Sequence, residues 1–121
     1  MPHERLQNFV IIDYTKEIVL VVIDGDRENP FIVAVGQYGI DESTHTAEVA
    51  FAVRDDQQNS GIGFEILKYL TYLAKRQGLL GFTAEVLVEN KPMLHVFEKG
   101  GFEIKKKIDS GVYELTLKFK T

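Results

Sequence analysis

The sequence predicts an α+β fold in which a mixed, mostly antiparallel sheet is flanked by two helices. Two observations lead to this prediction. Most apolar residues lie in short runs or alternate with polar ones, as is typical of strands. In residues 60–77 and 90–100 they instead recur every three to four positions, as on one side of a helix. The expected order of elements, β-β-β-α-β-α-β-β, is that of a mixed α+β sheet.

Length and composition indicate one ordinary folded domain. The chain has 121 residues, of which 45% are hydrophobic and 26% are charged. A chain of this size can bury roughly two thirds of its unfolded surface. We therefore expect residues 1–121 to form a single domain, either as a minimal protein or as part of a longer one.

The charge and the residue counts exclude several kinds of site. The formal net charge of −4 argues against nucleic acid as the main partner, because phosphate binding needs a basic face. A negative net charge would suit a cationic substrate. It is also an ordinary feature of soluble proteins, and this second interpretation is the one we favour. The absence of cysteine excludes disulfides and thiolate chemistry, and the three histidines lack metal-ligand spacing, so no metal is expected. No segment is long and apolar enough to span a membrane, and the first residues do not resemble a signal peptide, so we expect a cytoplasmic protein.

Three strands are expected before the first helix. Residues 17–24 are a continuous β-branched run, which predicts a strand buried on both faces. Residues 31–40 and 44–54 are the next two strands. Turn-forming residues at 24–30 and 41–44 separate the three, so we expect a hairpin meander.

The third of these strands has two different faces. One face is apolar and consists of Ala47, Val49, Phe51 and Val53. The other face carries a single carboxylate, Glu48, among small residues. This second face leaves room for a ligand, or simply for a helix to lie close.

The two helices and the remaining strands have clear boundaries. Asn59 or Ser60 can cap the first helix, and Gly78 is suited to end it. A strand at 82–89 leads to the second helix, for which Asn90 is the expected N-cap. Two further strands, separated by a turn, form a closing hairpin over 102–119.

The turn before the first helix, with the pattern Gln58-x-x-Gly61-x-Gly63, has two interpretations. The first turn of a helix leaves backbone N–H groups without partners, and glycine lets a phosphate approach them closely. The segment is therefore a candidate pyrophosphate site, although it matches neither the Walker motif nor the dinucleotide fingerprint. The alternative is a tight strand-to-helix turn without a ligand.

Several motifs together resemble the GNAT superfamily of acyl-CoA-dependent N-acetyltransferases. The features that match are Val53, the 58–63 turn, the amphipathic helix after it, a strand ending in Asn90, and "EKGGF" at 98–102. The resemblance covers residues 16–119 and is strongest over 46–102. Within the superfamily, the sequence is similar to the acetyltransferase domain at the C-terminus of large bacterial protein-lysine acetyltransferases.

The resemblance implies a fold and a cosubstrate. In this family the strand corresponding to 46–54 splays away from its neighbour, and the pantetheine arm of acetyl-CoA lies in the gap. The residues that would contact the cosubstrate are Phe51, Ala52, Val53, Gln58, Asn59, Ser60, Gly61, Ile62, Gly63 and Asn90. For Asn90, a plain helix cap is an equally good interpretation.

The resemblance also implies direct transfer of the acetyl group to an amine. Glu48 matches the family's strand-borne glutamate and is our candidate general base, acting directly or through water. Glu85 is a second candidate, which would orient the substrate. Backbone N–H groups near 51–53 would polarise the thioester carbonyl. The alternative for Glu48 is a glutamate at an edge or paired to a helix, with no chemistry.

The sequence departs from the family pattern in three places. Phe97 stands where many members have a tyrosine that protonates the leaving thiolate, and Ser60 replaces a basic residue. The family's first strand and helices, which shape the acceptor pocket, look abbreviated before residue 16. His95 and Met93 are interpreted as a surface and a core residue without a catalytic role.

The sequence thus predicts an acetyl-CoA-dependent N-acetyltransferase acting on a primary amine, with a protein lysine as the favoured acceptor. A small-molecule amine is the alternative acceptor. Phe97 and the short N-terminal part also motivate a non-catalytic CoA-binding module, and a purely structural domain would bind no CoA. A homodimer and a longer multidomain chain are both compatible with the sequence.

Overall fold

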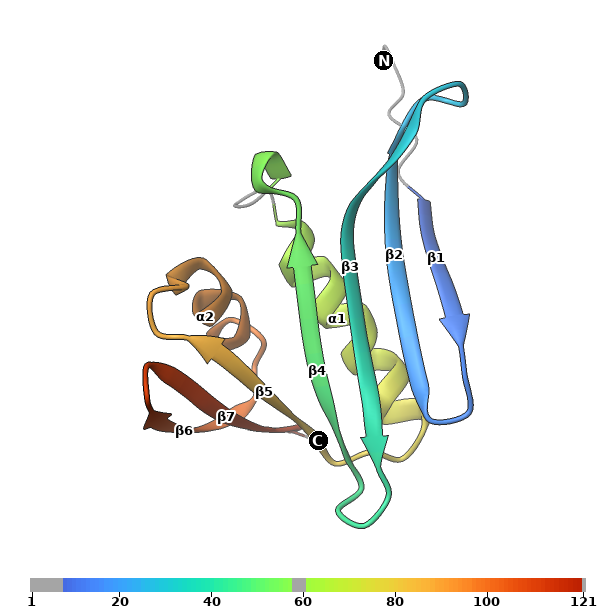
Figure 1. Cartoon of the computed structure of the whole chain (residues 1–121). Helices are drawn as coiled ribbons and strands as arrows, with labels where there is room; N and C mark the ends of the chain where they lie inside the picture. The colour runs from blue at the N-terminus through green and yellow to red at the C-terminus, as the bar shows by residue number, and fades with distance from the viewer. Residues whose placement is uncertain (1–7, 58–60, 121) are drawn as a thin grey trace.

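Seven strands form one mixed sheet in the order β1-β2-β3-β4-β5-β7-β6, and two helices pack against it (Figure 1). The computed structural model describes residues 8–57 and 61–120. The elements are β1 (Asn8–Asp13), β2 (Glu17–Gly25), β3 (Pro30–Asp41), β4 (Thr46–Val53), η1 (Asp55–Gln57), α1 (Ile62–Arg76), β5 (Gly81–Leu87), α2 (Lys91–Glu98), β6 (Glu103–Asp109) and β7 (Val112–Lys118). The α+β fold with its mostly antiparallel sheet is therefore confirmed.

The first four strands form an antiparallel meander that contains one strand more than the sequence predicted. The hairpins β2–β3 and β3–β4 lie where the turn-forming residues of the sequence predicted them. The additional strand, β1, pairs with β2 along its whole length, from Asn8 opposite Ile23 to Asp13 opposite Ile18. A tight turn joins the two strands, with the N–H of Tyr14 donating to the carbonyl of Glu17 at 2.8 Å.

Strand β2 is not buried on both faces, so that prediction was wrong. Its burial alternates: Ile18, Leu20 and Val22 are fully buried, whereas Val19 and Val21 are only half-buried. A β-branched run predicts burial on both faces only when layers cover both. In the part of the chain that is described, both helices lie on the same side of the sheet, so one face of β2 has no layer over it.

Helix α1 lies against β3 and β4 because its apolar stripe faces the sheet and the sheet makes room for it. Ile66 and Leu70 are fully buried in this contact. At Gly36 a Cβ atom would lie 2.4 Å from Cγ2 of Ile66, so only glycine allows the helix this close to β3. Gly78, with φ +82, follows the last turn of the helix as predicted.

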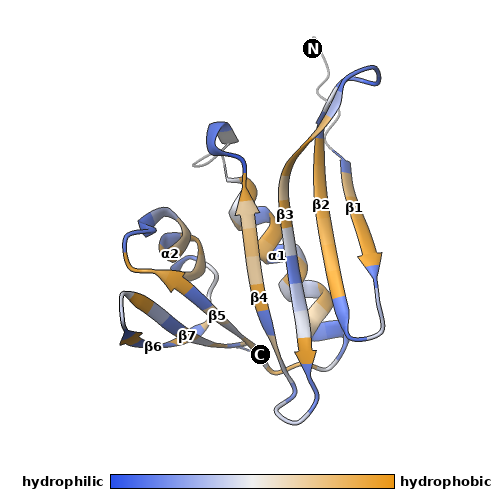
Figure 2. Cartoon of the chain, in the orientation of Figure 1, coloured by the Kyte–Doolittle hydropathy of each residue, from blue (hydrophilic) through white to orange (hydrophobic). Residues whose placement is uncertain are grey.

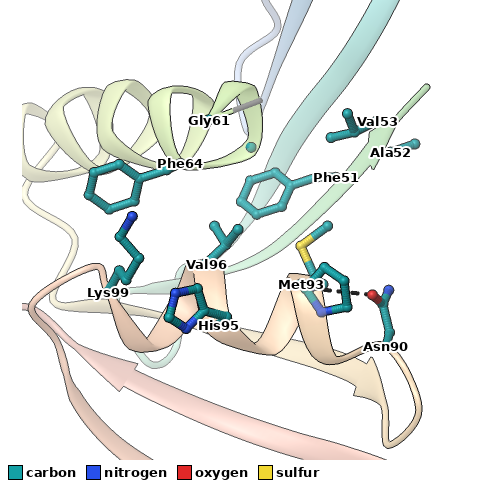
Figure 3. A pocket seen from close by; sticks show the side chains of 12 residues that line it. Phe51, Ala52, Val53, Gly61, Phe64, Asn90, Met93, His95, Val96 and Lys99 are labelled. Atoms are coloured by element: carbon teal, nitrogen blue, oxygen red, sulfur yellow. Dashed lines mark hydrogen bonds between the residues drawn. The ribbon is translucent and has the colours of Figure 1, made fainter. Parts of the chain in front are cut away.

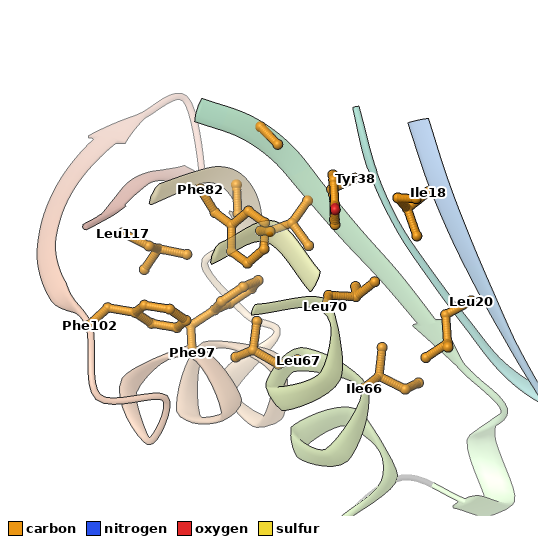
Figure 4. Close-up of a cluster of buried hydrophobic side chains, with 14 of the residues drawn as sticks. Ile18, Leu20, Tyr38, Ile66, Leu67, Leu70, Phe82, Phe97, Phe102 and Leu117 are labelled. Carbon is orange, nitrogen blue, oxygen red and sulfur yellow. The ribbon is translucent and has the colours of Figure 1, made fainter. Parts of the chain in front are cut away.

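A second part of the core lies between α2 and the strands β5 and β7 (Figure 4). The ring of Phe82 contacts that of Phe119 edge-on, with centroids 5.0 Å apart. Leu67 and Leu70 of α1 join this cluster to the one over β2 and β3, so a single core runs under both helices.

Hydropathy differs along the sheet (Figure 2). Strands β1 and β2 are hydrophobic along most of their length. In β5, β6 and β7 hydrophobic residues alternate with hydrophilic ones, many of them charged. Neither described helix combines the length and the apolar character needed to cross a membrane.

Candidate active site

Strands β4 and β5 are parallel neighbours that separate after three residue pairs. The last pair is Glu48 opposite Thr83. Beyond it β5 continues beside β7, whereas β4 stays with β3, so the two strands diverge (Figure 1). The sheet therefore opens into a V whose apex is at Glu48 and Thr83.

A cavity of about 370 Å³ lies in the mouth of this V, on the side of the sheet that carries the helices (Figure 3). Strand β4 contributes Phe51, Ala52 and Val53 to its wall. The N-terminal turn of α1 and one side of α2 form the rest. Its volume falls within the range of about 300–1,000 Å³ that is typical of small-molecule sites.

The N-terminus of α1 points its first amides at this cavity. Gly61 is the N-cap, with φ +89, and no side chain caps the helix there. An L residue rarely adopts this φ, which explains the glycine. Amides in a first helical turn have no acceptor within the helix, and the helix dipole makes this end positive. Gly61 and Gly63 both line the cavity, so an anion in it would meet backbone N–H groups.

Helix α2 presents a second wall. Asn90 caps the helix as predicted, its side chain accepting from the N–H of Met93 at 3.3 Å, and it also lines the cavity. The side-chain oxygen of Asn90 accepts the capping hydrogen bond, so its amide nitrogen remains available to donate a hydrogen bond to a ligand. Met93 is half-buried and His95 exposed, as predicted, yet both line the cavity.

Lys99 brings a positive charge to the cavity. Its Nζ lies 4.9 Å from the centre of the Phe64 ring, across the cavity mouth from α2 to α1. The sequence analysis did not identify Lys99, Phe64 or Val96 as residues of this cavity. The signal was present, because Pro92, Val96 and Lys99 follow helical spacing and therefore share one side of α2.

Glu48 lies on the other face of the sheet, where it is exposed. It lines a hollow of about 480 Å³ together with Asp41, Thr46 and Thr83. The sequence indicated a single carboxylate among small residues on this face, but hydroxyl groups and the second carboxylate of Asp41 surround Glu48 in the hollow. No described helix packs on this face, so the alternative of a helix-paired glutamate does not hold either.

Two further carboxylates, Asp41 in the same hollow and Glu85 on β5, lie on that face. The side-chain hydroxyl and the N–H of Ser43 donate to Asp41 at 2.7 and 3.0 Å, which holds the pKa of that carboxyl below its usual range. Asp41 is therefore an anion at neutral pH. Glu85 is exposed on β5, two residues beyond Thr83, and so faces the same side as Glu48.

A sequence model of the "Acetyltransferase (GNAT) family" matches residues 1–102. The chain belongs to this family.

Relatives of known sequence and structure agree with this assignment. "Acetyltransferase Pat" of Mycolicibacterium smegmatis is 32% identical over 90 residues, which are 74% of this chain and 27% of that protein. The GNAT domain of S. lividans PAT has a TM-score of 0.73 and 27% identity, over 89% of this chain and 64% of that one. The cAMP-binding acyltransferase from Mycobacterium smegmatis has a TM-score of 0.72 and 28% identity, over 89% of this chain and 33% of that one. The chain thus spans only about a quarter of the curated relative.

The GNAT residues predicted from the sequence fall into four groups. Those brought together around the cavity are Phe51, Ala52, Val53, Gly61, Gly63 and Asn90. Ile62 is buried beneath it and would contribute only its backbone. Gln58, Asn59 and Ser60 lie outside the described residues. The two candidate catalytic residues, Glu48 and Glu85, lie on the opposite face of the sheet. For all of these residues, the functional role stays a prediction.

Proposed function

We propose that this GNAT domain transfers the acetyl group of acetyl-CoA to a primary amine, with the side chain of a protein lysine as acceptor. The observation that carries the proposal is the V between β4 and β5. A cavity lies in its mouth on the helix side, and the carboxylate of Glu48 lies at its apex on the open side. A donor in the cavity and an acceptor on the open face would therefore approach the apex from opposite faces.

The helix side has the groups that CoA requires. The amides of the first turn of α1 would hold its pyrophosphate, and Lys99 would add a charge at the same mouth. Phe51 and Val53 would line the pantetheine arm. Bound acetyl-CoA supplies the acetyl group as a thioester, and N–H groups of β4 near Phe51 would donate to its carbonyl oxygen.

The open side has the groups that an amine requires. A lysine ammonium has a pKa of about 10.4 in water, so it must lose a proton before its nitrogen can attack. Glu48 at the apex of the V would accept this proton, directly or through water. The amine nitrogen then bonds to the acetyl carbon as the carbon–sulfur bond breaks, and the nitrogen releases its second proton to solvent. Because Phe97 has no hydroxyl, a solvent proton would neutralise the thiolate.

The position of Phe97 favours a second candidate, a CoA-binding module without catalysis. Its ring is 2% exposed and does not line the cavity, so this position offers no proton donor to a thiolate. One similar solved structure is named a cAMP-binding acyltransferase, and this chain covers 33% of it, so a domain of this fold also occurs within a longer protein that binds another ligand.

The two candidates differ in one measurement. Acetyl-CoA is incubated with lysine peptides and with small amines, and release of free CoA thiol is recorded beside calorimetric binding of CoA. Turnover that needs an amine supports the acetyltransferase. Tight CoA binding without turnover of any acceptor supports the module, and absence of CoA binding would overturn both.

A further inference from the structure

The open face of the sheet carries an apolar patch that no described helix covers. The patch consists of Val10, Ile12, Val19, Val21 and Val35. Register places these residues side by side on three strands, with Val10 opposite Val21, Ile12 opposite Val19, and Val21 opposite Val35. Val10 and Ile12 are each 41% exposed. Contiguous exposed apolar surface of this kind typically marks an interaction site.

The fold explains why the patch is uncovered. Strand β1 turns directly into β2 through Tyr14–Lys16, so the chain between these strands is too short to cross the face. Both helices lie on the other side, where Phe9 of β1 contacts Tyr69 of α1 at 6.4 Å between ring centroids. Strand β1 therefore turns one face toward α1 and the other away from both helices, and all six of its residues are exposed.

The apolar patch leads to the candidate base. Val35 lies opposite Ala52, and Gly39 lies opposite Glu48, so β4 forms the boundary of the patch. Ala50 and Ala52, between the patch and Glu48, are small and exposed. Gln37 of β3, opposite both Val19 and Ala50, is the exposed polar residue on this path, and beside it Ala50 and Ala52 leave the way from the patch to the apex of the V low.

Carboxylates follow on the far side of β4. Glu85 of β5 and Glu114 of β7 are directly opposite each other, on the face that carries Glu48. Like charges opposite one another on a sheet are unfavourable by themselves. Lys107 lies opposite Glu114 on its other side and compensates part of this repulsion. The open face thus has an apolar half and a charged half, which contains Lys105, Lys107 and Lys118 besides the two glutamates, and Glu48 on β4 lies between the two halves.

We propose that this open face is the docking surface for a protein acceptor whose reactive lysine projects from an apolar surface. The proposal rests on the proposed function and names its acceptor class. The apolar patch would bury the residues beside the lysine. The lysine stem would cross Ala50 or Ala52, and its ammonium would reach Glu48, with Glu85 and Glu114 attracting it electrostatically.

The shape of the face argues for a protein over a small amine. A small amine could occupy the hollow beside Glu48, but it would leave the apolar patch on β1, β2 and β3 uncovered. A protein partner can instead use a flat face, where a standard interface buries about 800 Å² on each side. Apolar contact and charge complementarity together would then select the lysine.

Two synthetic peptides of equal length test the proposal, each with one lysine. In one the lysine is flanked by valine and leucine, and in the other by serine. Their Kd values are measured by calorimetry in the presence of CoA, and their kcat/KM values by thiol release.

The double variant Val10→Lys and Ile12→Lys is compared with Ile108→Lys. Ile108 is 62% exposed and faces the helix side, which makes it a matched control.

We expect the native protein to prefer the apolar-flanked peptide about tenfold in Kd and in kcat/KM. The double variant should lose this preference, the control should keep it, and the Kd of CoA should be the same in all three. Lysine is well tolerated on edge strands, and thermal melts verify folding.

Three results of the binding and kinetic measurements would overturn the proposal. They are equal binding of the two peptides, a preference that persists in the double variant, and a higher kcat/KM for Nα-acetyl-lysine amide than for either peptide. A dimer in solution that the double variant dissociates would assign the face to a second copy of the chain and overturn it as well. Differential binding without any turnover would retain the docking surface and reject the acetyltransferase, so the two failures can be told apart.

Discussion

The ring of Phe97 in α2 stacks on the ring of Phe51 in β4, with centroids 5.4 Å apart and planes inclined by 20°. Phe51 lines the cavity, and Phe97 supports it from the core. The position that carries a tyrosine in many GNAT enzymes therefore serves packing in this chain. It also holds one wall of the candidate CoA site in place.

We predict that Phe97→Ala lowers the free energy of unfolding by about 3–5 kcal/mol, because it leaves a cavity where a fully buried ring was. The Phe51 ring loses its support, so CoA should also bind more weakly. Urea unfolding and calorimetry measure the two effects. Phe97→Leu is the control: it should recover most of the stability, and an unchanged CoA affinity in Phe97→Ala would show that the wall does not depend on this stacking.

The two glycines at the start of α1 should respond to alanine in opposite ways. Gly61 has φ +89, so Gly61→Ala should cost about 1 kcal/mol of stability through backbone strain alone, since open space surrounds the added Cβ. Gly63 lies inside the helix, where Gly63→Ala should stabilise by about 0.5–1 kcal/mol. Its Cβ would lie 3.6 Å from Cγ2 of Val96, in the wall of the cavity.

Thermal unfolding and CoA titration of both glycine variants provide the test. Gly63→Ala should combine higher stability with weaker CoA binding, because the methyl group narrows the approach to the first-turn amides. If CoA binds both variants as tightly as the native protein, the pyrophosphate does not lie at this turn.

Glu48→Gln should lower kcat by about a hundredfold, because it removes the group that accepts the amine proton. The Kd of CoA should stay the same, since Glu48 lies on the face opposite the cavity. Glu85→Gln should raise KM for the acceptor more than it lowers kcat. Glu103→Gln, exposed at the far strand β6, is the control for loss of charge. An unchanged rate and pH profile in Glu48→Gln would exclude it as the base.

Tyr38 should make stability depend on pH in the alkaline range. Burial of the ring raises the pKa of its hydroxyl to about 12, and the Asp13 carboxylate adds to this shift. The hydroxyl donates to Oε1 of Gln77, at the end of α1. The unfolded chain releases this proton near pH 10, before the folded protein does, so alkali favours unfolding.

Below pH 10 the contribution of Tyr38 to the free energy of unfolding should be fully present. It should fall by roughly 2–3 kcal/mol as the pH rises to about 12. Tyr38→Phe removes the titrating group, so the difference in unfolding free energy between the native protein and this variant should shrink over that range. Urea unfolding at stepped pH measures it. Parallel curves for the two proteins would contradict the assignment, whatever the other tyrosines contribute.

Much of the fold could be predicted because its signals are local. The helical periodicity after Gly61, the Asn90 cap and Gly78 each depend on residues within one or two turns of the chain, and the structure confirms all three. Strand β1 was missed although "NFVIID" is an apolar run. Whether such a run becomes a strand depends on a partner, here β2, which the run itself does not encode.

The sequence by itself determined the order of the elements from β2 onward, the glycine turn and the family to which the chain belongs. Only the tertiary structure decided which face of each strand is covered. It placed Glu48 in an exposed hollow opposite the cavity and left the apolar side of β1 and β2 open. It also brought Lys99 to Phe64. The physical reason is that burial and charge at a site depend on which elements pack together. That packing is set by contacts between residues far apart in the chain, whereas periodicity and capping act between neighbours.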